Sequence, residues 1–164
     1  MSRIVLRCVL AFLCFGFSTA CSTFDRHWQE AGQPKGRATR WDGQWKSGKK
    51  LYANGAYHHG RLRCVLVPQP NQGLKAYFHA NWLIFSGNYD MTLQPVLAGP
   101  RRGNVRHYQG THDLPAAFGG TYHYQAMIAG DHLTATYTCS IDQGIFDLRR
   151  VLLPKENADL HAQH

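Results

Sequence analysis

The chain has 164 residues, with 18 lysines and arginines against 10 aspartates and glutamates, so its net charge is +8 with histidine neutral. This length suits one domain with a modest core and excludes two domains of ordinary size. No stretch is apolar over the roughly twenty residues that a membrane-spanning helix needs, which excludes a helical integral membrane protein.

The first twenty residues have the composition of an export signal. Arg3 and Arg7 give a cationic start, residues 8–17 are apolar, and residues 18–20 are small. A segment of this kind is removed during export. We therefore expect residues 1–20 to be a signal peptide and the mature protein to begin at Cys21.

Residues 18–21, Ser-Thr-Ala-Cys, resemble the lipobox of bacterial lipoproteins. The resemblance implies a lipid anchor on Cys21, which would hold the protein on a membrane of the bacterial cell envelope, facing the periplasm. Ser18 stands where a lipobox usually has leucine. Ordinary secretory cleavage, which would give a soluble periplasmic or secreted protein, therefore stays open as the alternative.

The number of cysteines bears on the same question. Cys8 and Cys14 leave with the signal, so three of the five cysteines remain: Cys21, Cys64 and Cys139. A thiol without a partner is unusual in an oxidising compartment. If Cys21 carries lipid, the other two form an even pair, and we predict a disulfide between Cys64 and Cys139.

The mature chain stays basic, because 16 basic residues remain against 10 acidic ones, a net charge of +6. Many of the cations fall in two groups: Lys35, Arg37, Arg40, Lys46, Lys49 and Lys50, and then Arg101, Arg102 and Arg106. Beside a membrane each cation gains roughly 1 kcal/mol from anionic headgroups. Anionic lipid or glycan is thus a candidate partner, next to the simpler interpretation of a solvated surface. An exported chain without a recognised motif is not expected to bind nucleic acid.

Both ends of the mature chain are polar. Residues 21–39 contain Gly32, Pro34 and Gly36 without a sustained period, so we predict a flexible linker. Its aromatic residues, Phe24 and Trp28, can dock on the folded body or on the membrane. Residues 154–164 are predicted to be disordered, which leaves residues 40–153 as the folded domain.

Within that domain apolar and polar residues alternate with a period of two, which predicts an all-β fold. The alternation is nearly complete along residues 122–128 and 133–139, and Gly130-Asp131 between them supplies a tight hairpin turn. Eight strands are expected, over residues 41–47, 62–66, 76–82, 89–93, 105–109, 122–128, 133–139 and 146–148. Short loops favour a small antiparallel up-and-down barrel, whose closure removes exposed edges. A flattened two-sheet sandwich is the alternative.

Gly43-Gln44-Trp45 in the first expected strand, with Arg149 or Arg150 in the last, resembles the calycin superfamily, which includes the lipocalins. Members of that superfamily are meander barrels in which an arginine of the last strand packs across a tryptophan of the first. Such a cation-π contact contributes about 0.5–2 kcal/mol. The resemblance implies that Gly43, Trp45, Arg149 and Arg150 close the barrel, and that a small apolar molecule can bind inside.

The interior residues Trp82, Tyr122, Tyr124 and Tyr137 are either filled core or the lining of a ligand site. The predicted disulfide favours a filled or flattened interior, because the two Cα atoms of a disulfide lie within about 7 Å of each other. Fold alone does not decide between these interpretations.

The sequence offers little catalytic chemistry. It contains 10 histidines, but the adjacent pair His58-His59 points to opposite faces of a strand, and no pair has the spacing of a known zinc site. Thr111-His112-Asp113 is the one cluster that suggests hydrolysis, and a turn is the simpler interpretation because catalytic triads assemble from separate segments. We assign no metal, no cofactor and no catalytic residue.

The sequence therefore predicts a non-enzymatic, exported envelope protein, anchored by lipid, with a binding or structural role. A lipocalin-like carrier of a small apolar ligand is the second hypothesis, and an unrecognised hydrolase is the third. An enclosed cavity would favour the carrier, whereas a filled core crossed by a disulfide would exclude it.

Overall fold

A computed structural model of the protein describes residues 23–33, 36–50, 57–82, 85–96 and 104–152. The predicted signal peptide, Cys21 and the predicted tail at 154–164 lie outside these residues, as do Arg101 and Arg102. Within the described ranges, no helix has the length and apolar character needed to cross a membrane.

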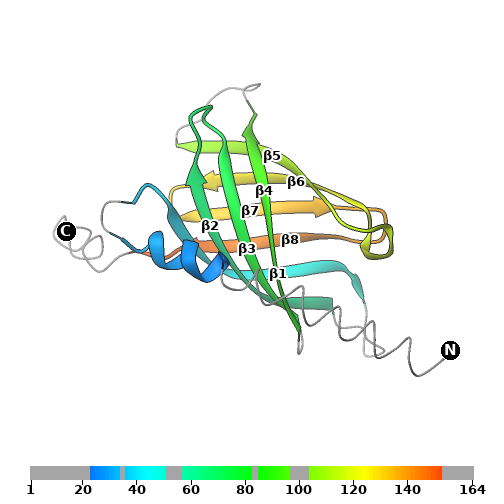
Figure 1. The fold of residues 1–164 in the computed structure, drawn as a ribbon. Coiled ribbons are helices and arrows are strands. Elements are labelled where there is room, and N and C mark those ends of the chain that lie inside the picture. The colour runs from blue at the N-terminus through cyan, green and yellow to red at the C-terminus, as the bar shows by residue number, and fades with distance from the viewer. Residues whose placement is uncertain (1–22, 34–35, 51–56, 83–84, 97–103, 153–164) are drawn as a thin grey trace.

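The described chain folds into a closed barrel in which each strand pairs with the next and the last pairs with the first. All of these pairings are antiparallel, so the predicted eight-stranded up-and-down barrel is confirmed. The strands are β1 (Thr39–Lys50), β2 (Tyr57–Pro68), β3 (Leu74–Trp82), β4 (Phe85–Pro95), β5 (Val105–Asp113), β6 (Thr121–Ala129), β7 (His132–Thr138) and β8 (Gln143–Arg150). Figure 1 shows β2, β3 and β4 crossing β6, β7 and β8 at a steep angle, as two opposite walls of the barrel.

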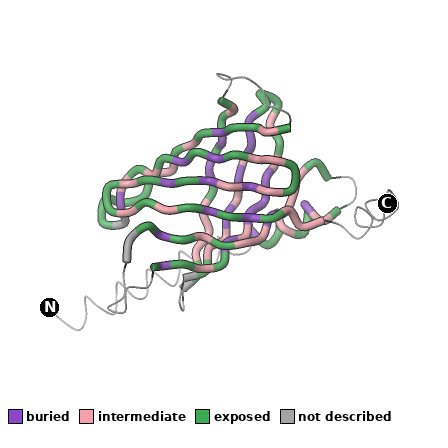
Figure 2. The backbone as a smooth tube through the Cα atoms, turned by 180° about the vertical axis from the view of Figure 1, so that it is seen from behind, coloured by how far each residue is buried: buried purple, intermediate pink, exposed green. Residues whose placement is uncertain are grey.

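Alternation along each strand decides which side chains fill the interior. On β6, Tyr124 and Ala126 are buried, while Gln125 and Met127 are exposed. The same alternation of buried and exposed residues runs along β7 and β8 (Figure 2). Because apolar residues are removed from water mainly on the inner face, the period of two in the sequence indicates which face of each strand lines the core.

The two ends of the barrel are filled to different degrees. We call the end at which β1, β3, β5 and β7 finish the mouth, and the end at which β1 begins and β8 finishes the closed end. Inward residues toward the closed end are almost fully buried: Trp41, Leu66, Ala76, Leu93, Leu133 and Leu148. Inward residues toward the mouth are only half-buried: Trp45, Ala80, Tyr89, His112 and Tyr122.

Residues 23–30 form a helix that packs on the outer face of β2 and β3 (Figure 1). Phe24 and Ala31 are buried against Val65, and the ring of His27 stacks on Tyr77 at 3.9 Å. The prediction of a flexible linker over residues 21–39 therefore does not describe this segment. The physical reason is that Val65 points outward from the barrel and needs an apolar cover.

Two arginines fix the helix on the barrel. Arg63 of β2 lies over the rings of Phe24 and Trp28, at 5.2 and 5.3 Å. Arg40 of β1 lies over Trp28 at 5.3 Å and donates hydrogen bonds to the carbonyl oxygens of Trp28 and Gln29, at 2.5 and 3.2 Å. Carbonyls in the last turn of a helix lack partners within the helix, so Arg40 caps it. Arg40, one of the basic residues grouped in the sequence analysis, therefore binds the helix.

Replacement of Phe24 by alanine tests how firmly the helix is docked. We expect Phe24→Ala to lower the free energy of unfolding by about 3 kcal/mol, because a large ring is lost from a buried contact. Urea unfolding measures the change. The matched control is Gln29→Ala on the exposed side of the same helix, expected to change stability by no more than about 0.5 kcal/mol. Equal effects of the two variants would contradict the docking.

Candidate functional site

A layer of aromatic rings crosses the interior of the barrel. Phe78 of β3 stacks on Tyr89 of β4 at 5.0 Å and contacts Phe146 of β8 at 5.8 Å. Phe146 in turn contacts Tyr124 of β6 at 5.9 Å and Tyr137 of β7 at 5.4 Å. Tyr89 and Tyr124 share a hydrogen bond. We call these five residues the aromatic floor, because they separate the filled closed end from the mouth.

A carboxylate stands on the mouth side of this floor. Asp142, in the turn between β7 and β8, accepts hydrogen bonds from the hydroxyls of Ser47 and Tyr137, at 2.7 and 2.8 Å. It also accepts the backbone N–H of Gln143 at 2.8 Å. Ser47 is only 1% exposed, and a carboxylate in such surroundings is stable only when donors satisfy its oxygens. Asp142 thus ties the end of β1 to β7 and β8.

Cys139 lies beside this carboxylate. Its sulfur accepts the backbone N–H of Asp142 at 3.3 Å and hydrogen-bonds with the hydroxyl of Tyr122. Gly119 has a φ of 106° and packs so closely that a Cβ there would come within 2.8 Å of the Cys139 sulfur. Only glycine adopts this backbone without strain. The β5–β6 connection, with the 3-10 turn η1 (Ala116–Phe118), therefore folds against the β7–β8 turn at the mouth.

Burial keeps the hydroxyls around the mouth uncharged. It is the largest cause of a raised pKa at Tyr89, Tyr122, Tyr124 and Tyr137. The hydrogen bond to Cys139 raises the pKa of Tyr122 further, and the one to Asp142 does the same for Tyr137. At neutral pH the tyrosines therefore present protonated, neutral hydroxyls.

His58 lies at the mouth end of β2, points inward beside Trp45, and is 9% exposed. Burial lowers its pKa below the usual 6.5, while the charge of Asp142 acts in the opposite direction. The unfolded chain thus binds this proton more tightly than the folded chain. The stability linked to His58 is complete above pH 6.5 and is lost as the pH falls below that value. At neutral pH the side chain is uncharged.

The mouth has open space next to Gly87, and we call this space the hollow. This residue of β4 lies opposite Ala80 of β3 and, two positions from inward-facing Tyr89, points into the barrel. A Cβ built on Gly87 meets no described atom within 4 Å. By contrast, a Cβ on Gly144 would strike the ring of Tyr137. The hollow therefore lies on the mouth side of the floor, where two small residues, Ala80 and Gly87, are neighbours on the inner face of β3 and β4.

The wall beside this hollow has the fewest paired residues. β4 and β5 are paired at Gln94–Gln109 and at Pro95–Tyr108, near the closed end. Toward the mouth the ring of His112 on β5 packs against Tyr89 on β4 at 5.5 Å. The ring of His112 thus covers part of the hollow on this side.

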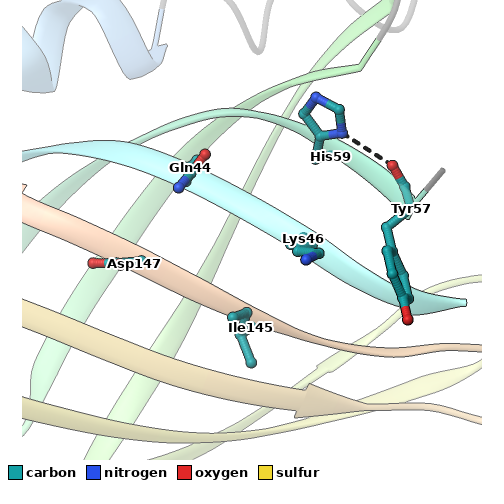
Figure 3. Close-up of a pocket in the computed structure, with 6 residues that line it drawn as sticks. All are labelled: Gln44, Lys46, Tyr57, His59, Ile145 and Asp147. Carbon is teal, nitrogen blue, oxygen red and sulfur yellow. Dashed lines mark hydrogen bonds between the residues drawn. The ribbon is translucent and has the colours of Figure 1, made fainter.

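A second hollow lies on the outside of the barrel (Figure 3). It has a volume of about 390 Å³ and is lined by Gln44, Lys46, Tyr57, His59, Ile145 and Asp147. Several of its polar groups already have partners: Lys46 lies over the ring of Tyr57 at 4.6 Å, His59 contacts the Tyr57 carbonyl at 3.0 Å, and Asp147 contacts His132 at 2.7 Å. The labelled side chains in Figure 3 do not converge on one point, so we place the candidate site inside the barrel.

The predicted disulfide is wrong, because Cys64 and Cys139 are both free. Cys64 is fully buried in β2, opposite Trp41 and Phe78, whereas Cys139 follows β7 at the mouth. Rings of the aromatic floor stand between the two sulfurs. Burial also raises the pKa of the Cys64 thiol, which keeps it protonated and inert. Without a disulfide, the even pairing of cysteines no longer supports lipidation of Cys21.

The strand register separates Trp45 from the arginines with which it was expected to pack. Trp45 lies opposite Phe146, whereas Arg150 lies opposite Trp41. Four residues along a strand correspond to roughly 13 Å. Trp41, at the closed end, is thus the tryptophan of β1 that lies beside Arg150.

The other residues expected to close the barrel, Arg149, Gly43 and Trp45, make other contacts. Arg149 faces outward and contacts Asp131 at 3.4 Å. Gly43 lies so close to β8 that a Cβ would strike its backbone. The indole N–H of Trp45 donates to the carbonyl of Asn81 at 3.0 Å, across Gly60, where a Cβ would strike the indole. Trp45 therefore lines the mouth.

Three of the four predicted lining residues come together at the mouth. The rings of Tyr122, Tyr124 and Tyr137 lie 5.8–6.2 Å apart. Trp82 ends β3, but its side chain lies outside the described residues. Sequence reasoning missed Gly87, Ala80 and Asp142. The sequence feature that could have predicted the hollow is the pair of small residues, Ala80 and Gly87, at inward positions of two paired strands.

The suspected hydrolytic cluster is not assembled. Alternation turns His112 inward and Asp113 outward, where the Asp113 carboxylate accepts the hydroxyl of Thr121 at 2.7 Å. Ser47 is outside this cluster and donates a hydrogen bond to Asp142. In the described part of the chain, no three His, Cys, Asp or Glu side chains gather as metal ligands.

Comparison of the chain with protein-family models, with curated proteins and with solved structures finds no match. The site is therefore interpreted from its own geometry.

Substitution of two inward glycines tests the hollow. We expect Gly87→Ala to leave the free energy of unfolding unchanged or to raise it by up to about 1 kcal/mol, because the methyl group enters open space and glycine disfavours strands. Gly144→Ala should lower it by about 1–3 kcal/mol, because the carbonyl oxygen of Lys46 and the ring of Tyr137 fill that space. Urea unfolding compares the two variants. A loss at Gly87 as large as the loss at Gly144 would show that the interior is filled there.

Proposed function

We propose that this chain is an exported envelope protein, anchored by lipid on Cys21, that binds a small apolar ligand in the mouth of its barrel and catalyses no reaction. The observation that carries the proposal is the hollow at Gly87 above the aromatic floor. A closed barrel whose core were filled from end to end would have no room for such a ligand.

The lining of the mouth indicates the chemistry of the ligand. Aromatic rings and Ala80 supply apolar contact, and the tyrosine hydroxyls supply neutral polar groups. The oxygens of Asp142 are occupied by three donors, and His58 is neutral at pH 7. A charged ligand would lose its water without gaining a partner. A largely apolar molecule with one or two neutral polar groups fits this lining best.

The proposed location in the cell envelope rests on the sequence alone. A cationic start, an apolar run and small residues before Cys21 support export, and the lipobox-like residues 18–21 support the anchor. Two acyl chains are sufficient for stable membrane attachment. A soluble periplasmic or secreted protein remains the alternative, and the mass of the mature N-terminus distinguishes the two.

A role in docking a protein partner is the second candidate. It is favoured by a wide groove of about 1430 Å³ that is lined by the β2–β3 turn, the end of β4, and both inward and outward residues of β5, β6, β7 and β8. Met127 and Ile145 are exposed there, at 37% and 50%. The neighbouring side chains are mostly amides and hydroxyls, so this face is less apolar than a stable interface.

Binding of N-phenyl-1-naphthylamine, an apolar fluorescent probe, tests the proposal. We expect its fluorescence to rise and saturate as it is titrated with the protein. Gly87→Leu should weaken the affinity at least about tenfold, or about 1.4 kcal/mol, because the leucine side chain occupies the hollow. The matched control is Gln125→Leu, which places the same side chain on the exposed outer face and should bind like the wild type.

Equal affinity of Gly87→Leu and wild type would contradict a site in the hollow. Loss of binding in Gln125→Leu, with binding kept in Gly87→Leu, would favour the outer groove. Urea unfolding of both variants establishes that each is folded.

A further inference from the structure

The docked helix includes residues very close to the proposed anchor. Thr23 is the first residue that the structure describes, and Cys21 precedes it by two positions. Two residues of chain span at most about 7 Å. A lipid on Cys21 would therefore sit next to the barrel itself rather than at the end of a long tether.

The direction of the helix places that point on the mouth side of the barrel. Phe24, near the start, lies 5.3 Å from His79, and His27, one turn later, lies 3.9 Å from Tyr77. Along β3, His79 is nearer the mouth than Tyr77. The described part of the helix thus runs from the mouth side toward the closed end, and Thr23 lies at its mouth-side end.

The helix is held too firmly to swing freely. Phe24 is 2% exposed, Arg63 lies over its ring, and Arg40 caps the last turn of the helix. The exposed side of the helix carries both signs of charge, with Arg26 and Glu30 3.9 Å apart. Electrostatic attraction to anionic lipid therefore does not set how the barrel is oriented relative to the bilayer. We expect the anchor and the docked helix to set this orientation.

We infer that lipid on Cys21 holds the mouth of the barrel toward the bilayer, so that an apolar ligand passes between the membrane and the hollow at Gly87 without crossing open water. The inference rests on the proposed function, from which it takes the anchor and the ligand site. It adds the orientation of the barrel and identifies the membrane as the source or destination of the ligand.

Quenching of a fluorescent label by spin-labelled lipid tests the orientation. The full lipidated chain is placed in phosphatidylcholine vesicles that contain doxyl-phosphatidylcholine. One label is attached at Ser86→Cys, exposed at the mouth end of β4, and another at Pro70→Cys, exposed in the β2–β3 turn at the closed end. Both variants carry Cys139→Ser, and Cys64 is fully buried. We expect at least twofold stronger quenching at Ser86→Cys, because β3 alone separates the two ends by about 30 Å.

The controls separate this inference from the proposed anchor. Flotation of wild type with the vesicles, and its loss in Cys21→Ser, establishes the anchor, whereas failure of the wild type to float overturns it. Flotation with equal quenching at the two labels overturns the orientation alone. Phe24→Ala should float but lose the difference between the labels, while Gln29→Ala should keep it. A difference that persists in Phe24→Ala would overturn the role of the docked helix.

Discussion

The mouth of the barrel depends on the three hydrogen bonds that Asp142 accepts. Ser47 reaches it from β1 and Tyr137 from β7, and the backbone of Gln143 completes the set. These bonds hold Tyr137 against Phe146 and Tyr124. The carboxylate therefore fixes one side of the aromatic floor.

The aromatic floor separates the tightly packed closed end of the barrel from the open space at the mouth, where we propose that the ligand binds. Below it, inward leucines and Trp41 are buried to within a few per cent, and such packing stabilises the barrel. Above it, Ala80 and Gly87 replace large side chains and leave open space. Under the proposed function, packing that stabilises the barrel and binding of the ligand lie at opposite ends of one small domain, whose core is limited by its size.

The fold could be predicted because period-two alternation is a local property of the sequence. The docked helix was missed because residues 22–39 are polar and carry no helical period. Its signal lay elsewhere, in the buried run of Cys64, Val65 and Leu66, where an outward valine breaks the alternation. The prediction of a disulfide was wrong because a count of cysteines takes no account of the aromatic rings that separate Cys64 from Cys139. The partner of Trp45 could not be predicted, because register across a closed barrel is a long-range property.

The central claim is that the hollow beside Gly87 takes an apolar ligand, and its most direct test locates the bound probe. Nuclear Overhauser effects between N-phenyl-1-naphthylamine and the isotope-labelled protein report which protons lie beside it. The account predicts contacts from the probe to the α-protons of Gly87, the methyl group of Ala80 and the ring of Tyr122. Contacts to Met127 and Ile145 on the outer face instead would contradict it.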